Sequence, residues 1–250
     1  MQRYFVRTDQ FQDQFVTIEG NDSHHLQRVM RAQLGDQVIC SDGLNLHVKV
    51  RIMKMDKDAV TGEMIEHVPP STESNVRVWI AQSLPKADKM ELIIQKGTEL
   101  GAMRFTPFVS ARTIVHYDAK KETIRAERWQ KIAKEAAEQA HRYHVPQVDR
   151  IHTWVELLEL AQTADVAWIF FEKEEQMSLR SAIRQALAIP TLRNIMMIIG
   201  PEGGFSEHEI AQAQQAHIAS VSLGKRILRT ETASWVGLTC VGYETGEMGG

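Results

Sequence analysis

Cysteine is scarce in this chain of 250 residues, which contains only Cys40 and Cys240. The two lie far apart in the sequence and belong to no Cys-x-x-Cys pair, so we expect no disulfide, and a reducing compartment such as the cytoplasm fits. The ten histidines form no His-Glu-x-x-His motif and no Cys/His cluster. We therefore expect no metal site.

Long apolar runs are also missing. No stretch approaches the roughly 20 consecutive apolar residues that a membrane-spanning helix needs. The first residues lack the basic and then apolar pattern of a secretory signal peptide. We therefore expect a cytoplasmic protein without contact to membranes, whose 43% apolar residues suffice for one large core or two modest ones.

The formal net charge of −3 hides an uneven distribution of charged residues. Residues 77–146 hold 13 Lys and Arg against 8 Asp and Glu, whereas the flanking segments are both acidic. Many of these lysines fit ordinary solvated helix faces. A basic face in the same segment would supply the salt-sensitive attraction to phosphates on which RNA binding depends.

A cluster of turn-forming residues, Pro69-Pro70-Ser71-Thr72, divides the chain into residues 1–70 and 74–250. Before it, short apolar segments alternate with Gly and Asp turns, which predicts a small β-barrel with strands at Phe15–Ile18, Gln37–Cys40, Leu46–Met53 and Val60–Ile65. One predicted helix, Asp22–Arg31, interrupts the strands, with Asp22 or Ser23 as its cap.

On that helix His24, Arg28 and Arg31 recur at a spacing that would place them on one face. They are either ordinary surface residues or a face that docks on RNA.

Strand and helix patterns alternate after the boundary, which predicts an open parallel sheet covered on both faces. The expected strands include Val76–Gln82, Phe105–Val109 and Val166–Phe171, and the expected helices include one from Asp88 to about Gly101, Thr123–Tyr143 and Ser178–Ala188. Thr153-x-x-Glu156 is a capping box that starts a further helix. In the longest helix we expect a buried side formed by Ile124, Trp129, Ile132, Ala133, Ala136 and Ala140.

Two glycine-containing loops near the end of the chain carry the strongest functional signal. Ile195–Ile199 runs into Gly200-Pro-Glu-Gly-Gly-Phe205, and a Ser206-x-x-Glu209 capping box then opens a helix. The apolar segment Ile218–Leu223 ends similarly at Gly224, and Leu228-Arg-Thr-Glu-Thr-Ala233 leads into the last helix. Two such loops at the carboxyl ends of parallel strands would form one crevice, where glycine allows close approach of the main chain to a ligand.

The loop sequences exclude the common phosphate-binding motifs. Gly204 is followed by Phe205 and Ser206, so the first loop is not a Walker A loop, and it is not a Gly-x-Gly-x-x-Gly dinucleotide loop. Pro201 and Glu202 make it stiff and acidic, which would repel a polyphosphate. A tight turn without any ligand is the alternative for the first loop alone.

These two loops together resemble the cofactor site of SPOUT-class RNA methyltransferases, and more narrowly the bacterial 16S ribosomal RNA (uracil-N3)-methyltransferase family. The resemblance spans nearly the whole chain. It includes Arg3-Tyr-Phe-Val6, His24–Arg31, Gly35-Asp36, Ser83–Glu91, Gln95–Gly101, Glu138-Gln139 and Val145-Pro146. The Gly-Pro-Glu-Gly-Gly-Phe element alone would also fit methyltransferases that modify ribose.

The resemblance implies a PUA-like β-barrel for RNA binding over residues 1–70 and a SPOUT-type parallel sheet over 74–250. It also implies a C-terminal deep trefoil knot, which is very rare in proteins, and pairing as a homodimer. In the last helix Ala233, Val236, Gly237, Cys240 and Val241 have spacings that suit close packing, either on a partner subunit or on the chain's own sheet.

The implied reaction transfers a methyl group from S-adenosylmethionine to N3 of a uridine in 16S rRNA, within the small ribosomal subunit. Once N3 loses its proton, negative charge spreads onto the flanking carbonyl oxygens, and a guanidinium would stabilise it. Arg229 is the first candidate for that role, and Arg7 or Arg31 of the partner subunit is the second. Glu231 or solvent would accept the proton, unless Glu231 only caps its helix.

The resemblance also assigns the binding residues. Main-chain groups of the two loops would recognise the adenine, and Glu172 would bind ribose hydroxyls. The cofactor set is Phe171, Glu172, Gly200, Pro201, Glu202, Gly203, Gly204, Leu223, Gly224, Ile227, Leu228, Arg229, Thr230 and Ala233. The RNA-binding set is Arg7, His24, His25, Arg28 and Arg31 in the barrel, with Lys86, Lys89, Lys96, Arg112 and Arg142 in the large domain.

The chain departs from the family pattern at two places, both near the expected RNA side. Ala87 stands where glycine is common, and the residues Gln139–His144 are unusual for this segment of the family.

Two other functions compete with base methylation. A ribose 2′-O-methyltransferase is disfavoured by the barrel and the His24–Arg31 element, and a non-catalytic RNA-binding protein is disfavoured by the intact loop glycines and Arg229.

Overall fold

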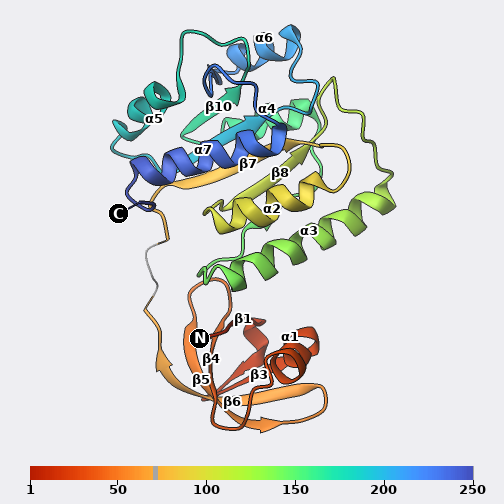
Figure 1. Cartoon of the computed structure of the whole chain (residues 1–250), viewed down its shortest axis with the longest axis vertical. Coiled ribbons are helices and arrows are strands. Elements are labelled where there is room, and N and C mark those ends of the chain that lie inside the picture. The colour runs from red at the N-terminus through yellow and green to blue at the C-terminus, as the bar shows by residue number, and fades with distance from the viewer. Residues whose placement is uncertain (70–72, 250) are drawn as a thin grey trace. The chain divides into compact units, whose positions relative to one another are not determined.

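A computed structural model describes residues 1–69 and 73–249, and its contacts divide the chain into two compact units (Figure 1). Unit 1 comprises Met1–Glu73 and Ala137–Val145, and unit 2 comprises Ser74–Ala136 and Pro146–Gly250. The chain thus returns to unit 1 once, through Ala137–Val145, although the sequence pattern placed this segment in the second domain. None of the helices in the described ranges has the length and apolarity needed to cross a membrane.

Unit 1 is built on a six-stranded sheet with the order β1-β4-β5-β6-β3-β2. The β1–β4 pair is parallel and the other pairs are antiparallel. Alternate apolar side chains, among them Val16, Val38 and Val50, form its buried core. All four strands expected here are present: the sheet consists of β1 (Arg3–Phe5), β2 (Phe11–Gln12), β3 (Phe15–Glu19), β4 (Gln37–Ser41), β5 (His47–Met55) and β6 (Ala59–His67).

The helical insertion of unit 1 differs from its expected form. Helix α1 (Gly20–His24) starts after Glu19, which makes no side-chain capping bond, and not after Asp22 or Ser23. It continues as a wider π-helical turn, η2 (His25–Val29), in which the Met30 N–H donates to the His25 carbonyl at 2.9 Å. Arg31 lies beyond the helix with φ 53°. The prediction that His24, Arg28 and Arg31 share one helical face was therefore wrong, because the helix ends before Arg31.

Unit 2 contains the expected open sheet, in which every neighbouring pair of strands is parallel. Its order is β12-β10-β11-β7-β8-β9. The central strands are apolar on both faces, as parallel sheets buried between helices require. The strands are β7 (Arg77–Ser83), β8 (Arg104–Phe108), β9 (Gln147–Val148), β10 (Val166–Phe170), β11 (Asn194–Ile199) and β12 (Ala219–Val221).

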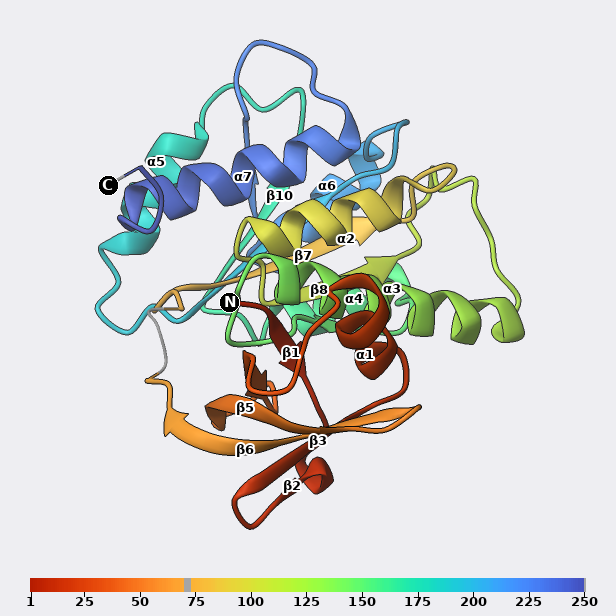
Figure 2. The same ribbon diagram turned by 60° about the horizontal axis from the view of Figure 1, so that its bottom comes forward.

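Helices cover both faces of this sheet (Figures 1 and 2). Helices α4 (Trp154–Ala161) and α6 (Glu207–Gln215) pack on one face through Leu157 and Ile210. Helices α2 (Lys89–Glu99) and α7 (Thr230–Glu244) lie side by side on the other face, and α5 (Leu179–Leu187) contacts α7.

Helix α7 approaches the sheet closely because Gly237 has no side chain. A Cβ there would lie 2.7 Å from Met197 Sδ and 2.9 Å from the Phe170 ring. Ala233 and Val241 are buried along the same helix, whereas Val236 and Cys240 are only partly buried. Of the two packing alternatives for these small residues, the chain's own sheet therefore accounts for Gly237, Ala233 and Val241.

The longest helix, α3 (Ala119–Gln139), begins and ends four residues before the expected range of Thr123–Tyr143. Asp118 explains its start, since its carboxylate accepts from the Lys121 N–H at 2.9 Å. Trp129, Ala133 and Ala136 are buried as expected, and Ile132 and Ala140 are half-buried. The prediction that Ile124 is buried was wrong, because this residue is 53% exposed near the start of the helix.

Candidate functional site

The carboxyl ends of β7, β8, β10, β11 and β12 lie at one edge of the sheet, because these strands run parallel. The loops that follow them therefore converge in unit 2. They include both glycine loops singled out in the sequence, and crevices at this edge are where open parallel sheets bind ligands.

The first glycine loop folds back tightly after β11. The Gly204 N–H donates to the Pro201 carbonyl at 2.9 Å, and Gly204 has φ 64°, a conformation that favours glycine. A Cβ on Gly204 would lie 3.2 Å from Glu172 Oε1, so the Glu172 carboxylate, which follows β10, lies against this loop. Phe205 is buried beneath it and stacks on Phe108.

The second glycine loop, between β12 and α7, is open to solvent. Gly224 has φ 110°, and a Cβ placed on it would have no atom within 4 Å. Ile227 is 80% exposed, and Leu223 and Leu228 are partly exposed. Exposed apolar side chains beside accessible main chain suit a flat, partly apolar ligand. Together with the Glu172 carboxylate, which follows β10 and lies against the first glycine loop, these residues fit an adenosine-containing cofactor.

A buried group of hydrogen bonds joins the two loops. Thr230 Oγ1 donates to the Gly200 carbonyl at 2.6 Å, and Gln82 Nε2 donates to Thr230 Oγ1 at 2.8 Å. Thr230 was expected in the cofactor-binding set, and its hydroxyl is engaged within the protein. Sequence reasoning missed Gln82, although a polar residue at the end of the apolar strand Val78–Ala81 was a usable signal.

An ion-pair cluster also spans the loops. Lys89 Nζ, from α2, lies 2.8 Å from Glu202 Oε1 and 3.5 Å from Glu231 Oε2. Burial by itself raises the pKa of Glu202, but the hydrogen bonds from Lys89 and from the Lys86 N–H outweigh it and hold that pKa below its usual value. The hydrogen bond to Glu202 raises the pKa of Lys89. Lys89, expected to contact RNA, is thus already paired with two carboxylates.

The two candidate catalytic side chains occupy the start of α7. Arg229 is the N-cap residue of the helix and its side chain is exposed, with no capping hydrogen bond. Glu231 lies in the first turn with its side chain 12% exposed, and its Oε2 atom has no hydrogen-bond partner within the described ranges. Neither side chain is therefore explained by capping alone.

The loop after β8 forms a third wall beside the first glycine loop. Arg112 Nη1 donates to the Gly203 carbonyl at 2.8 Å, and the Ala111 N–H donates to Glu209 Oε1 at 2.8 Å. Glu209 also completes the expected capping box with Ser206. The sequence showed the capping box but gave no sign of the contact with Ala111.

The basic residues expected to bind RNA in the large domain have different surroundings. Lys86 is exposed, and Lys96 is paired with Glu99 at 2.8 Å. Arg142 was wrong. It is 7% exposed and donates to Glu73 at 2.7 Å, because the chain leaves α3 through His141, with φ 56°, and enters the interior of unit 1.

The candidate residues of unit 1 are mostly on its surface. His24, Arg28 and Arg31 are exposed, and Arg7 is exposed with Nε 3.0 Å from Asp9 Oδ1. His25 is different, since it is half-buried with Nδ1 3.0 Å from the Tyr4 hydroxyl. His25 thus packs on its own unit, and the other four remain accessible to a ligand.

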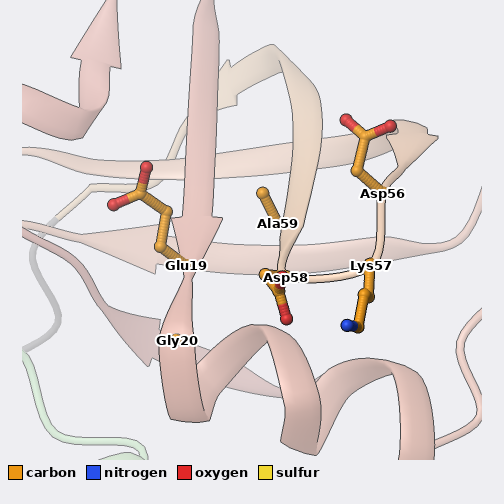
Figure 3. A pocket seen from close by; sticks show the side chains of 6 residues that line it. All are labelled: Glu19, Gly20, Asp56, Lys57, Asp58 and Ala59. Atoms are coloured by element: carbon orange, nitrogen blue, oxygen red, sulfur yellow. The ribbon is translucent and has the colours of Figure 1, made fainter.

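A separate hollow in unit 1 has the wrong charge for RNA (Figure 3). It is lined by Glu19 and Gly20 and by Asp56–Ala59, and Lys57 and Asp58 point toward helix α1. Three carboxylates against one ammonium would repel phosphates. Throughout the described part of the chain, no cluster of three or more His, Cys, Asp or Glu side chains is arranged to hold a metal ion.

One departure from the family pattern has a structural counterpart. Ala87 adopts φ 56° in the loop before α2, a left-handed conformation that is uncommon for residues other than glycine. The glycine common at this place in the resembled family would adopt it without strain.

Comparison with known proteins agrees with this architecture. A family profile described as an RNA methyltransferase domain matches residues 72–242, and a profile described as an RNA methyltransferase PUA domain matches residues 18–65. The chain is 41% identical to the ribosomal RNA small subunit methyltransferase E of Bacillus subtilis (strain 168), over 98% of this chain and 97% of that protein.

Solved structures with bound cofactor are also similar. The ribosomal RNA small subunit methyltransferase E from Neisseria gonorrhoeae bound to S-adenosyl methionine matches with a TM-score of 0.86 and 28% identity, over 98% of both chains. A methyltransferase from Legionella pneumophila in complex with the same cofactor matches with a TM-score of 0.86 and 26% identity, over 97% of both chains.

Proposed function

The chain belongs to the bacterial 16S ribosomal RNA (uracil-N3)-methyltransferase family, and we propose on that basis that it methylates N3 of one uridine in 16S rRNA. The methyl donor is S-adenosylmethionine. The observation that carries the proposal is the pair of glycine loops at the carboxyl ends of β11 and β12, joined through Thr230 and Gly200.

The cofactor would be held mainly by main-chain groups of the two loops. Residues 200–204 and 223–228 offer backbone amides and carbonyls to the adenine edge, and the side chain of Ile227 covers its face. The Glu172 carboxylate, which lies beside Gly204, would bind the ribose hydroxyls. When bound, S-adenosylmethionine supplies a methyl group activated by a sulfonium.

The chain's own residues must make uridine N3 nucleophilic. The exposed Arg229 guanidinium would stabilise the negative charge that spreads onto the flanking carbonyl oxygens when N3 loses its proton. Glu231 would accept that proton, because its carboxylate lies in the first turn of α7, two residues after Arg229, and in the described structure is paired only at 3.5 Å with Lys89 Nζ. Arg7 or Arg31 of the partner subunit is the second candidate for the role of Arg229.

RNA binding would use the exposed basic side chains. In unit 1, which matches a PUA profile, these are Arg7, His24, Arg28 and Arg31, and in unit 2 they are Lys86 and Arg112. Contacts of this kind with phosphates fix the orientation of the RNA. We place the reaction in the cytoplasm, on RNA of the small ribosomal subunit.

A homodimer with a deep trefoil knot in each subunit completes the proposal. The dimer is supported by the face of α7 that its own sheet leaves uncovered, with Val236 and Cys240 partly exposed and Tyr243 exposed. Trp235 lies on the same helix, and its Nε1 is a buried donor without a partner among the described residues. Sedimentation equilibrium tests this part: a mass of one chain at micromolar concentration contradicts the dimer.

Mass spectrometry of nucleosides from 16S rRNA tests the reaction itself. RNA from cells lacking this protein should lose one 3-methyluridine, and the wild-type protein should restore it. Loss of a 2′-O-methylated nucleoside with 3-methyluridine unchanged would favour the ribose methyltransferase. An unchanged nucleoside profile would favour a non-catalytic RNA-binding protein.

A further inference from the structure

Gln82 is a polar side chain in an apolar setting. It is 0% exposed and lies in β7, paired in register with Ile199 of β11 and Pro107 of β8. Its Nε2 atom lies 2.8 Å from Thr230 Oγ1, 3.0 Å from the Ser83 carbonyl oxygen and 3.4 Å from the Gly200 carbonyl oxygen.

These neighbours fix the orientation of the Gln82 amide. The two carbonyl oxygens can only accept, and the Thr230 hydroxyl gives its proton to Gly200 at 2.6 Å and therefore accepts as well. The amide nitrogen, which is the donor, must face all three. Gln82 and Thr230 thus connect the end of β7, the first glycine loop and the start of α7, with the second glycine loop directly before it.

Stability of the fold does not account for an amide at this position. The Gln82 Oε1 atom is buried without a hydrogen-bond partner in the residues that the structure describes. A buried acceptor without a partner destabilises the folded state, and an apolar side chain would avoid that cost. The amide is instead well suited to hold the Gly200 carbonyl and Thr230 in place.

We propose that Gln82 and Thr230 are positioning residues, which hold the two glycine loops in the arrangement that binds S-adenosylmethionine. This inference rests on the proposed function. Both side chains are buried, so they act through the loops and not on the reacting atoms. Without their hydrogen bonds the loops would populate other conformations, and the apparent affinity would fall in proportion to the population that remains competent.

The test compares Thr230→Val, which has the same shape but no hydroxyl, with the conservative Thr230→Ser. Thr163→Val is the matched control, since the Thr163 hydroxyl also donates to a backbone carbonyl, at 2.7 Å, but lies before β10 at the opposite edge of the sheet. The dissociation constant of S-adenosylmethionine is measured by calorimetry, and kcat and KM by methyl transfer to small-subunit RNA.

Thr230→Val should raise both Kd and KM for S-adenosylmethionine about tenfold, with kcat at saturating cofactor within about twofold, because the bound cofactor restores the competent arrangement. Thr230→Ser and Thr163→Val should bind like the wild type. Unchanged cofactor affinity in Thr230→Val overturns the inference. A fall in kcat with unchanged KM also overturns it, because that pattern assigns the hydroxyl to the reacting groups.

Gln82→Leu provides a second route if Thr230→Val does not fold. This variant should bind the cofactor more weakly while its melting temperature stays equal to or above that of the wild type. Wild-type affinity in Gln82→Leu, or weaker binding that only follows a lower melting temperature, contradicts a positioning role. Failure of the wild-type protein to bind S-adenosylmethionine would instead refute the proposed function.

Discussion

Arg229 stands at a position where a positive charge is unfavourable for the helix that it starts. It is the N-cap residue of α7, and the amino end of a helix carries partial positive charge. Its exposed guanidinium makes no capping bond, so helix stability does not explain an arginine there. The proposed role of Arg229, stabilising negative charge on the uracil carbonyl oxygens, would explain it.

Replacing Arg229 by alanine should therefore separate activity from stability. We expect kcat to fall about 100-fold, as for removal of one donor to a developing anion, while the melting temperature stays equal or rises. Enzyme kinetics and thermal unfolding check this. Arg193→Ala, an exposed arginine just before β11 at the other edge, is the control and should keep wild-type kcat. Full activity in Arg229→Ala would show that another basic residue stabilises the developing negative charge.

Ala87 shows backbone strain at a single residue. With φ 56° it occupies a region where a Cβ is disfavoured by about 1 kcal/mol or more. We expect Ala87→Gly to stabilise unit 2 by up to about 1 kcal/mol in urea unfolding, since relief of strain outweighs the added freedom of the unfolded chain. Ala164→Gly, at a turn residue without positive φ, should not stabilise. A lower unfolding midpoint in Ala87→Gly would contradict this account of the loop.

At the scale of elements, two helices of unit 2 begin with the same capping box but have different surroundings. Thr153 and Glu156 form it at α4, and Ser206 and Glu209 form it at α6. Glu156 also pairs with Arg150 in the loop directly before α4, whereas Glu209 holds a different loop, the one after β8, through the Ala111 N–H. The first turn of α6 is therefore part of the candidate site, and that of α4 is not.

Thr153→Ala and Ser206→Ala should each destabilise unit 2 by about 1 kcal/mol, the usual effect of losing a cap. Ser206→Ala alone should also weaken cofactor binding, because Ser206 directly follows the first glycine loop. Urea unfolding and calorimetric titration with S-adenosylmethionine measure the two effects. Equal cofactor affinity in both variants would show that the cap of α6 does not contribute to cofactor binding.

The Glu73 carboxylate is one of the groups that hold the segment Ala137–Val145 in unit 1. Glu73 accepts from Arg142 Nη2 at 2.7 Å and from the Tyr143 N–H at 2.9 Å. Burial by itself raises the pKa of Glu73, but these hydrogen bonds and the Arg142 charge outweigh it, so the pKa lies below its usual 4.5. The resulting stability is present above pH 4.5 and is lost as the pH falls through the lowered pKa.

Glu73→Gln should accordingly lower the stability of unit 1 by about 2 kcal/mol at pH 7, since it removes charge-assisted hydrogen bonds. The difference from the wild type should shrink as the pH falls below 4.5, where the wild-type carboxylate becomes protonated. Thermal unfolding between pH 3 and pH 7 measures it. A difference that grows toward low pH would contradict the assigned direction of the shift.

For the whole molecule, the proposed cofactor site lies within unit 2, since the strands, loops and helices assigned to it belong to that unit. A ligand that binds only the folded state stabilises it by about 2.7 kcal/mol at 100 times its Kd. We expect S-adenosylmethionine to raise the calorimetric transition of unit 2 and to leave that of unit 1 in place. Gln82→Leu should show a smaller shift at the same cofactor concentration. A shift of the unit 1 transition alone would show that the cofactor does not bind to unit 2.

Local sequence signals determined the elements of unit 2 and both glycine loops. Buried parallel strands are continuous apolar runs, capping boxes join residues three apart, and positive φ favours glycine, so each feature is encoded within a few residues. The open sheet and both capping boxes followed from such patterns. The site residues drawn from the family resemblance stay predictions.

Tertiary structure decided which polar side chains bind the protein itself and which stay exposed. Arg142 looked like a surface cation, yet it pairs with Glu73, 69 residues away. Gln82 meets Thr230 across 148 residues. Such pairs depend on how strands and helices are brought together in space. They therefore cannot be recognised from one residue and its near neighbours in the sequence. The sequence thus located the loops that we propose to bind the cofactor, and only the fold showed which side chains hold them.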